Sequence, residues 1–239
     1  MEQIISAGLE ELGLTGRVPE DAPAQLAQYG QMLLEKNQVM NLTAIRDPEG
    51  VARLHMLDCA ALLKYCDFQG KTLIDVGTGA GFPGMVLKIL VPSLKITLLD
   101  SLSKRLDWLT EVYEDLDGVD SITTFHGRAE EFALEKEGFR DSFDLVTARA
   151  VADLRVLCEL CLPLVKVGGV FVAMKSSHTE EEIEQAKRAV KLLGGRIVSV
   201  EDYRIPTTEV VHRLVKVEKI SPTPKKYPRR FALIKKQPL

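Results

Sequence analysis

Apolar residues recur every three or four positions in the first seventy residues of the chain, which is the spacing of one helical face. Residues 21–38 carry them at Leu26, Tyr29, Met32 and Leu33. The same spacing continues through residues 47–65, where Asp47 and Pro48 form a typical helix start. We therefore expect residues 1–70 to form a helical N-terminal region.

The pattern changes at residue 71, where short apolar segments begin to alternate with amphipathic helical ones. Strands are expected at residues 72–76, 95–100, 121–126, 143–148, 168–174, 195–205 and 210–219. Helices are expected between the first six strands, at residues 82–91, 102–115, 128–136, 152–162 and 179–193. This alternation predicts a parallel sheet with helices on both faces, and the last two strands predict an antiparallel hairpin at its edge. The fold class is therefore α/β, with a doubly wound, mainly parallel, seven-stranded sheet in a domain at residues 71–239.

The composition is that of an ordinary globular protein, with 46% hydrophobic and 27% charged residues among 239. No apolar segment approaches the roughly eighteen residues of a membrane span. The first residues, MEQIISAGLEELG, lack the basic and then apolar order of a signal peptide, so a cytoplasmic location is expected.

Charge is distributed unevenly along the chain. The net charge is only −3, but residues 216–239 contain eight Lys and Arg against one acid, so they carry +7 and the other 215 residues carry −10. A basic C-terminal tail favours an anionic partner, although many charged segments are only solvated. The tail also contains Tyr227 and Phe231, which suit stacking on RNA bases but equally suit a last strand packed on the sheet. Its candidate RNA-binding residues are Lys225, Lys226, Arg229 and Arg230.

Cys158 and Cys161 have the spacing of half a metal or redox site, but a helix places both thiols on one apolar face beside leucines. Because there is no second pair and no nearby histidine, we expect buried core thiols instead. The four histidines show no spacing typical of a metal site. They are expected to be structural or surface residues, and no metal is expected.

Residues 73–101, LIDVGTGAGFPGMVLKILVPSLKITLLDS, predict a strand, a glycine-rich turn, a helix and a second strand that ends in an acid. This arrangement is typical of α/β proteins that bind the adenosine part of a cofactor. A P-loop is excluded because Gly84 is followed by Met85 and Val86 in place of Lys and Ser or Thr. The dinucleotide pattern Gly-x-Gly-x-x-Gly fits formally at residues 79–84, but alone it is a weak signal.

Two acids flank this turn. Asp100 suits the ribose hydroxyls of a dinucleotide or of another adenosine cofactor. Asp75 stands at the mouth of the first strand, where a carboxylate would repel a pyrophosphate at the helix N-terminus. It favours a cofactor with a cationic group and no phosphate, which is the character of S-adenosylmethionine. Further candidate cofactor contacts are the turn glycines Gly77, Gly79 and Gly81.

Several motifs resemble the bacterial glucose-inhibited-division protein B family, whose members are small-subunit rRNA guanine-N(7) methyltransferases. They are DVGTGAGFPG (75–84), LLDSLSKR (98–105), GRAEEF (127–132) and FDLVTARAV (143–151), together with NLTAI (41–45), RLHMLD (53–58) and KKYPRR (225–230). The resemblance covers nearly the whole chain, and the Gly-Phe-Pro-Gly ending of the turn is more specific than the general methyltransferase turn. The chain departs from the family pattern at Thr78, Met85 and Cys59, and by the charged segment EKEGFRDS before the fourth strand.

The resemblance implies methyl transfer from S-adenosylmethionine to N(7) of one guanine in the decoding-region loop of 16S rRNA. It implies that Gly77 and Phe82 contact the cofactor and that Arg149 faces the reaction cleft. It further implies that Ala129 and Glu130 flank the adenine of the cofactor. The residues that match family positions touching RNA or cofactor are Lys104, Arg128, Lys175 and Arg229.

The residues agree with this chemistry without the resemblance. Amine methylation is disfavoured because TARAVADL replaces the Asn/Asp-Pro-Pro-aromatic motif after the fourth strand, and no cysteine lies at a predicted strand end to act in carbon-5 methylation. Guanine N(7) carries a lone pair and no proton, so its methylation needs no general base. Catalysis can then rest on alignment. The candidate positioning residues are Lys175 and Arg149. Arg149 could bind the guanine carbonyl and a phosphate in a bidentate manner.

Three other functions stay open from the sequence. A small-molecule methyltransferase would share the turn but have no use for the basic tail. An NAD-dependent oxidoreductase would bind NADH without needing Asp75, and a non-catalytic RNA-binding assembly factor would need neither the turn nor both acids. The expected partner is 16S rRNA within the small ribosomal subunit or an assembly intermediate, with ribosomal proteins shaping the target. The chain is expected to act as a monomer.

Overall fold

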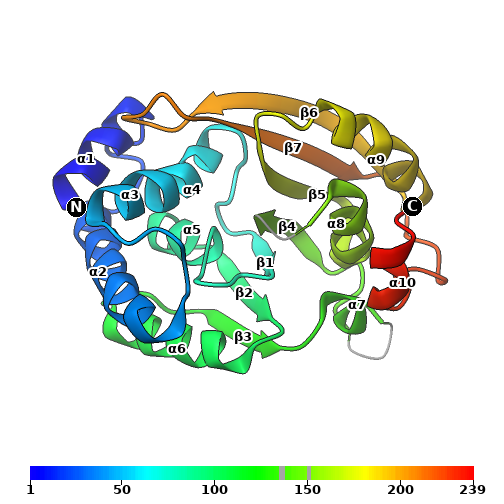
Figure 1. The fold of residues 1–239 in the computed structure, drawn as a ribbon, viewed down its shortest axis with the longest axis horizontal. Helices are drawn as coiled ribbons and strands as arrows, with labels where there is room; N and C mark the ends of the chain where they lie inside the picture. Colours follow the sequence, from blue (N-terminus) through cyan, green and yellow to red (C-terminus); the bar gives the residue numbers. More distant parts are fainter. Residues whose placement is uncertain (135–137, 150–151) are drawn as a thin grey trace.

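The computed structural model describes residues 1–134, 138–149 and 152–239 and contains a seven-stranded sheet of order β3-β2-β1-β4-β5-β7-β6 (Figure 1). The strands are β1 (Thr72–Val76), β2 (Lys95–Asp100), β3 (Ile122–His126), β4 (Phe143–Arg149), β5 (Val165–Ser176), β6 (Gly195–Arg204) and β7 (Val211–Lys219). Neighbouring strands are parallel except where β7 pairs with β5 and β6. The predicted fold class and the antiparallel hairpin at one edge are confirmed.

Helices cover both faces of the sheet (Figure 1). One face carries α5 (Gly84–Leu90), α6 (Ser103–Asp115) and the N-terminal elements α1 (Glu2–Glu11), α2 (Ala22–Met40), α3 (Pro48–Val51), η1 (Ala52–Leu57), α4 (Asp58–Ala60) and η2 (Ala61–Lys64). The other face carries α7 (Ala129–Phe132), α8 (Leu154–Cys161), η4 (Leu162–Leu164), α9 (Glu180–Leu192) and α10 (Phe231–Lys236). Within the described ranges, none of these helices combines the length and the apolar character needed to cross a membrane.

The N-terminal helices share one hydrophobic core with α5 and α6. Tyr29 of α2 is fully buried, and its ring stacks on that of Phe82 in the glycine-rich turn with 5.4 Å between the ring centroids. The Tyr29 hydroxyl also donates a hydrogen bond to the carbonyl of Ala80. Helix α2 therefore supports the turn from outside the sheet. The division of the chain into two domains at residue 70 stays a prediction.

Residues 47–65, predicted to be helical, contain a continuous helical run at residues 48–64 whose hydrogen-bond pattern changes through four short segments. The start at Asp47 is confirmed, because its side chain accepts a hydrogen bond from the amide of Gly50 at 2.7 Å. The chain then widens into the π-helical segment η1 and tightens into the 3₁₀ segment η2. The prediction did not include this change, because apolar spacing indicates which helix face is buried but not which backbone groups are hydrogen-bonded. Segments of π-helix are frequent at functional sites.

The structure corrects several predicted boundaries. Helix α7 ends at Phe132, whereas the prediction continued to residue 136; residues 135–137 lie outside the described ranges. Strand β5 is longer than the predicted 168–174. Helix α8 begins at Leu154 because the side chain of Asp153 caps it, and residues 150–151 before it lie outside the description. The tail ends in α10 and not in a strand, so Phe231 belongs to a helix.

Two residues shortly before β4, Arg140 and Asp141, fix the tail to the body of the protein. The guanidinium of Arg140 donates hydrogen bonds to three tail carbonyls, those of Thr223 (2.6 Å), Pro224 (3.3 Å) and Tyr227 (2.9 Å). The buried ammonium of Lys219 donates to Asp141 at 2.8 Å. The tail is therefore a docked part of the fold, and not the solvated arm that its composition allows.

Candidate functional site

The glycine-rich turn lies where the strand order reverses between β1 and β4, the point at which open α/β sheets bind ligands. Gly77, Gly79 and Gly81 have φ of +69°, +60° and +88°, in the left-handed region that favours glycine. A Cβ on Gly79 would find only the carbonyl of Gly77 at 3.9 Å, whereas one on Gly81 would lie 2.5 Å from the Tyr29 hydroxyl. Gly79 thus leaves backbone open to a ligand, while Gly81 allows close packing.

Asp75 lies beneath the turn and not in a cavity. Its side chain is fully buried, and it accepts hydrogen bonds from the hydroxyls of Thr78 (2.7 Å) and Thr147 (2.9 Å) and from the amide of Gly84 (3.1 Å). Burial raises the pKa of the Asp75 carboxyl, and these hydrogen bonds oppose the rise. The structure therefore corrects the picture of Asp75 as a carboxylate that faces a cofactor: it holds together the turn, β4 and the start of α5.

Asp100 lies at the cavity that the turn encloses. One oxygen of its carboxylate accepts hydrogen bonds from the amide of Gly79 (2.9 Å) and from Arg105 (3.3 Å), and the other accepts from the amide of Leu102 (2.9 Å). The cavity has a volume of about 450 Å³, within the usual range for small-molecule sites. Other residues lining it are Gly77, Gly79, Phe82, His55 and Arg149.

Arg149 is the last residue of β4 and closes this cavity on one side. Its guanidinium lies over the ring of Phe82, 4.8 Å from the centroid, and its side chain is 14% exposed. Arg149 also donates hydrogen bonds to Asp58 at 3.2 Å and to the carbonyl of Leu54 at 3.3 Å. The arginine is therefore salt-bridged and faces the cavity at the same time.

Asp58, the first residue of α4, is the centre of a buried network. Besides the bond from Arg149, it accepts hydrogen bonds from the hydroxyl of Tyr203 (2.7 Å) and pairs with Nδ1 of His212 (2.9 Å). Burial disfavours ionisation of Asp58, but the bond from His212 and the charge of Arg149 outweigh it and lower its pKa. One carboxylate thus joins β4, β6, β7 and the N-terminal helices.

His55 lies between the turn and this network. Its ring stacks on Phe82 with 4.5 Å between ring centroids, and its nitrogens approach Thr43 (2.7 Å) and Arg149 (3.1 Å). Burial, reinforced by the charge of Arg149, lowers the pKa of His55 to about 3, so the ring is neutral at physiological pH. A neutral ring adds no positive charge beside Arg149.

A second cavity, of about 400 Å³, adjoins the first and shares His55 and Arg149 with it. Lys175 lines this second cavity, and its ammonium donates to Glu182 at 2.6 Å and to the carbonyl of Ala152 at 2.9 Å. The two candidate positioning residues, Arg149 and Lys175, are therefore brought to the same cavity from the ends of neighbouring strands.

The turn at residues 127–130 follows β3, beside the end of β2. The amide of Gly127 donates to the carbonyl of Asp100 at 3.0 Å, and Ala129 and Glu130 are largely buried at the start of α7. Neither lines the cavity of the glycine turn. Arg128 lies over the ring of Phe231 in α10, 5.3 Å from its centroid, so it connects this turn to the basic tail.

The candidate RNA-binding residues fall into two groups. Arg229 is engaged within the protein: its guanidinium binds both oxygens of Glu159, which is fully buried, at 2.6–3.1 Å. Arg229, a candidate RNA-binding residue, thus has its charge paired within the fold. The candidates of the second group are exposed. They are Lys225, Lys226 and Arg230 in the tail and Lys104 in α6.

None of the four cysteines lines either of the two cavities at the glycine turn. Cys59, Cys158 and Cys161 are buried, and burial raises the pKa of each thiol well above its usual value. Cys66 is half-buried, and burial raises its pKa to about 11. The predicted core positions of Cys158 and Cys161 are confirmed. In the part of the chain that the structure describes, no cluster of three or more His, Cys, Asp or Glu could hold a metal.

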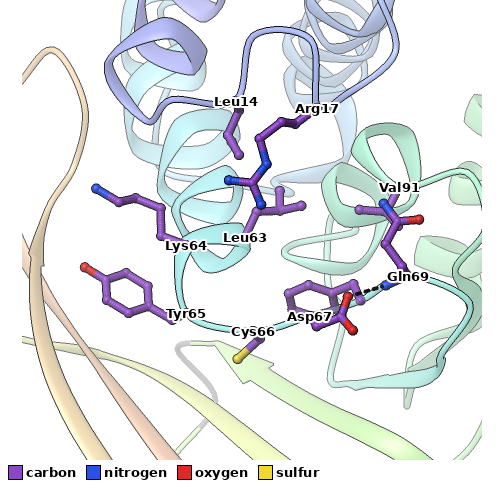
Figure 2. Close-up of a pocket in the computed structure, with 10 residues that line it drawn as sticks. Leu14, Arg17, Leu63, Lys64, Tyr65, Cys66, Asp67, Gln69 and Val91 are labelled. Carbon is purple, nitrogen blue, oxygen red and sulfur yellow. Dashed lines mark hydrogen bonds between the residues drawn. The ribbon is translucent and has the colours of Figure 1, made fainter.

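A further cavity of about 420 Å³ is lined by residues that precede β1 and by Val91, which follows α5 (Figure 2). Arg17 and Lys64 contribute cations, and Asp67 accepts a hydrogen bond from the amide of Gln69 at 3.0 Å. None of the candidate site residues lines it. It is therefore separate from the site at the glycine turn.

Several residues of the site were not singled out from the sequence. Asp58 and His55 lie in the motif RLHMLD, and Arg105 lies in LLDSLSKR, so the motifs marked their segments but not their roles. The histidines were expected to be structural or surface residues, yet His55 lines both cavities and His212 lines the second. A search for the spacing of metal ligands could not indicate these two histidines, because His212 binds Asp58 and His55 contacts Arg149.

Comparison with known proteins gives one consistent result. A family model described as rRNA small subunit methyltransferase G (GidB) matches residues 22–211. Proteins named ribosomal RNA small subunit methyltransferase G are 44% identical in Alkaliphilus metalliredigens and 45% identical in Oceanobacillus iheyensis, each over 100% of this chain and 98% of the relative. Among solved structures, M. jannaschii TYW2 in complex with AdoMet is similar with a TM-score of 0.55 at 16% identity, covering 70% of this chain and 76% of that one. That likeness concerns the fold alone.

Proposed function

The chain belongs to the rRNA small subunit methyltransferase G family, and from this premise we propose that it methylates N7 of one guanine in the decoding-region loop of 16S rRNA, with S-adenosylmethionine as methyl donor. The observation that carries the proposal is the family match over nearly the whole chain. The site geometry supports it, because a turn with an open backbone and a carboxylate at the end of β2 line one cavity.

The residues at the glycine turn fit S-adenosylmethionine. The open space above Gly79 admits a ligand against the backbone, and Asp100 has acceptor capacity for ribose hydroxyls. Gly77 and Phe82 complete the wall of the cavity, and Ala129 and Glu130 would flank the adenine. Asp75 and Gly81 would act indirectly, by holding the turn in shape. When bound, this cofactor supplies an electrophilic methyl group.

The protein's own residues would act by positioning. Guanine N7 has a lone pair and no proton, so no general base is required. Arg149 and Lys175, in the adjoining cavity, would hold the base in line with the methyl group. The neutral state of His55 limits positive charge where a cationic donor and a base that becomes cationic must meet.

The basic tail and Lys104 would contact rRNA phosphates, and Arg128 would link that surface to the cofactor side of the site. We further propose that the enzyme acts in the cytoplasm as a monomer, on the small ribosomal subunit or an assembly intermediate.

The test is transfer of labelled methyl groups from S-adenosylmethionine to small subunits isolated from cells that lack this gene. Chemical cleavage at N7-methylated guanines then locates the product. A single labelled guanine in the decoding-region loop is expected. Absence of label, together with tight binding of S-adenosylhomocysteine, would reject rRNA as the substrate and favour a small-molecule acceptor.

A further inference from the structure

The second cavity contains a donor and an acceptor side by side. Lys175 and Glu182 form an ion pair at 2.6 Å, and their side chains are only 13% and 20% exposed. The amide of Leu154 also donates to Glu182, at 2.5 Å. Both of these partners bind Oε1, and a carboxylate has a second oxygen with which to accept further hydrogen bonds. The pair is thus held in place from β5 and from the start of α8.

The sheet arranges these groups in a row that starts at the glycine turn. The turn follows β1, Arg149 ends β4, Lys175 lies near the end of β5, and Glu182 lies in the first turn of α9, which follows β5. Arg149 and Met174 are register partners, so Lys175 follows directly beyond Arg149. The row therefore runs from the cofactor cavity through two cations to a carboxylate.

Guanine presents its groups in the matching order. N7 and O6 are neighbouring acceptors, and N1–H and the N2 amino group follow as donors. If N7 faces the cofactor cavity, O6 meets the two cations and the donors meet the carboxylate. Adenine reverses this order, because its amino group replaces O6 and its N1 is an acceptor.

We propose that Glu182, supported by Lys175, recognises the Watson–Crick edge of the target guanine in the second cavity and thereby selects guanine over other bases. This assignment rests on the proposed function and adds a specificity residue to it. Enzymes that act on a base outside its stack commonly read it through hydrogen bonds to this edge.

The same carboxylate also acts on the rate. As the N7 lone pair bonds to the methyl carbon, the electron pair of the carbon–sulfur bond leaves with sulfur, and the guanine ring gains the positive charge that the sulfonium loses. That charge is shared with N1–H, which faces Glu182. A fixed carboxylate at this position stabilises charge that develops in the transition state, and it offsets the nearby cation of Arg149.

The experiment compares Glu182→Gln with Glu181→Gln as a matched control. Glu181 is exposed on the same turn of α9 and accepts a hydrogen bond from Gln185 at 3.0 Å. The substrates are small subunits reconstituted with guanine or with inosine, which lacks the N2 amino group, at the position that is methylated. Initial rates of labelled methyl transfer and the affinity for S-adenosylhomocysteine are measured for each protein.

We expect the wild type to prefer guanine over inosine by about tenfold, the value of one good base contact. Glu182→Gln should lower the rate on guanine by about tenfold or more and remove the preference, with S-adenosylhomocysteine affinity unchanged, while Glu181→Gln behaves as wild type. Equal wild-type rates on the two bases, which require no variant to fold, would overturn the assignment. A Glu182→Gln enzyme that keeps the preference would also overturn it. Wild-type transfer to neither substrate would overturn the proposed function itself.

Discussion

Two buried carboxylates in this protein each hold an arginine, and they differ in what the arginine can still do. Glu159 is fully buried and binds the guanidinium of Arg229 through both oxygens, so that arginine is engaged within the fold. Asp58 is equally buried, but it divides its oxygens among three side chains and leaves Arg149 facing two cavities. The first pair stabilises the docked tail, and the second orients a side chain at the site.

Replacing Glu159 with alanine should have the largest effect. Removing one partner of a buried ion pair typically costs about 3–5 kcal/mol of stability, because the other charge stays poorly solvated. Urea unfolding measures the loss, with Glu218→Gln as a control, because Glu218 is only half-buried and pairs with the exposed Arg196. S-adenosylhomocysteine affinity of the folded protein should not change; a parallel loss of affinity would mean that the two pairs do not differ as described.

Replacing Asp58 with asparagine should mainly affect activity. The variant keeps an acceptor for Tyr203 but loses the charge that orients Arg149. We therefore expect the rate of methyl transfer at saturating substrates to fall about a hundredfold, which corresponds to an activation barrier higher by about 2.7 kcal/mol. Asp202→Asn is the control, because Asp202 binds Arg213 outside the site. A rate loss matched by the control would show that Asp58 has no special effect on the site.

His55 predicts an acid-sensitive stability. Its pKa is about 3 in the folded protein, below the usual value of 6.5, so the unfolded chain binds the proton more readily and stability is lost as pH falls below about 6.5. For one such group, the free energy of unfolding falls by about 2 kcal/mol between pH 6.5 and pH 5. Urea unfolding of wild type and His55→Gln at both pH values measures it. Equal pH dependence of the two proteins would contradict the neutral buried state.

The smallest effects are expected on the exposed tail. Arg230→Ala or Lys226→Ala should each reduce the slope of log affinity for rRNA against log salt by about 0.7–0.9 per lost phosphate contact. Arg229→Ala should instead lower stability and leave the slope unchanged, because its charge already binds Glu159. Filter binding at several salt concentrations distinguishes them. An Arg229→Ala variant that changes the slope would place Arg229 with the RNA-binding residues.

The sequence predicts the sheet well because its signals are local. Short apolar segments, the helical segments between them and the glycine turn all depend on neighbouring residues, and the seven strands were found within a few positions. The helical run at residues 48–64 was predicted, but its π-helical segment was not, because apolar spacing is almost the same for α and π geometry.

The site was predicted less completely because its contacts are distant in the chain. Asp58 meets Tyr203 and His212 across 145 and 154 residues, and Asp75 meets Thr147 across 72. The sequence marks Arg149 and Arg229 as candidate site residues, but only the fold shows that Arg149 binds Asp58 and Arg229 binds Glu159. The same limit concealed Glu182, which resembles the other acids of its helix until Lys175 is placed beside it.

The bonds from Arg140 to the tail have a kinetic consequence. A disordered basic arm can capture RNA from a distance in many orientations, but it loses conformational entropy whenever it becomes ordered on its target. Here three carbonyls of the tail are already held by one guanidinium, so the exposed cations are presented in a fixed pattern. We expect such a surface to make fewer chance encounters productive and to dissociate readily from RNA of the wrong shape. If the tail binds rRNA as proposed, the enzyme would select its substrate by the form of a folded RNA surface before any base enters the cavity.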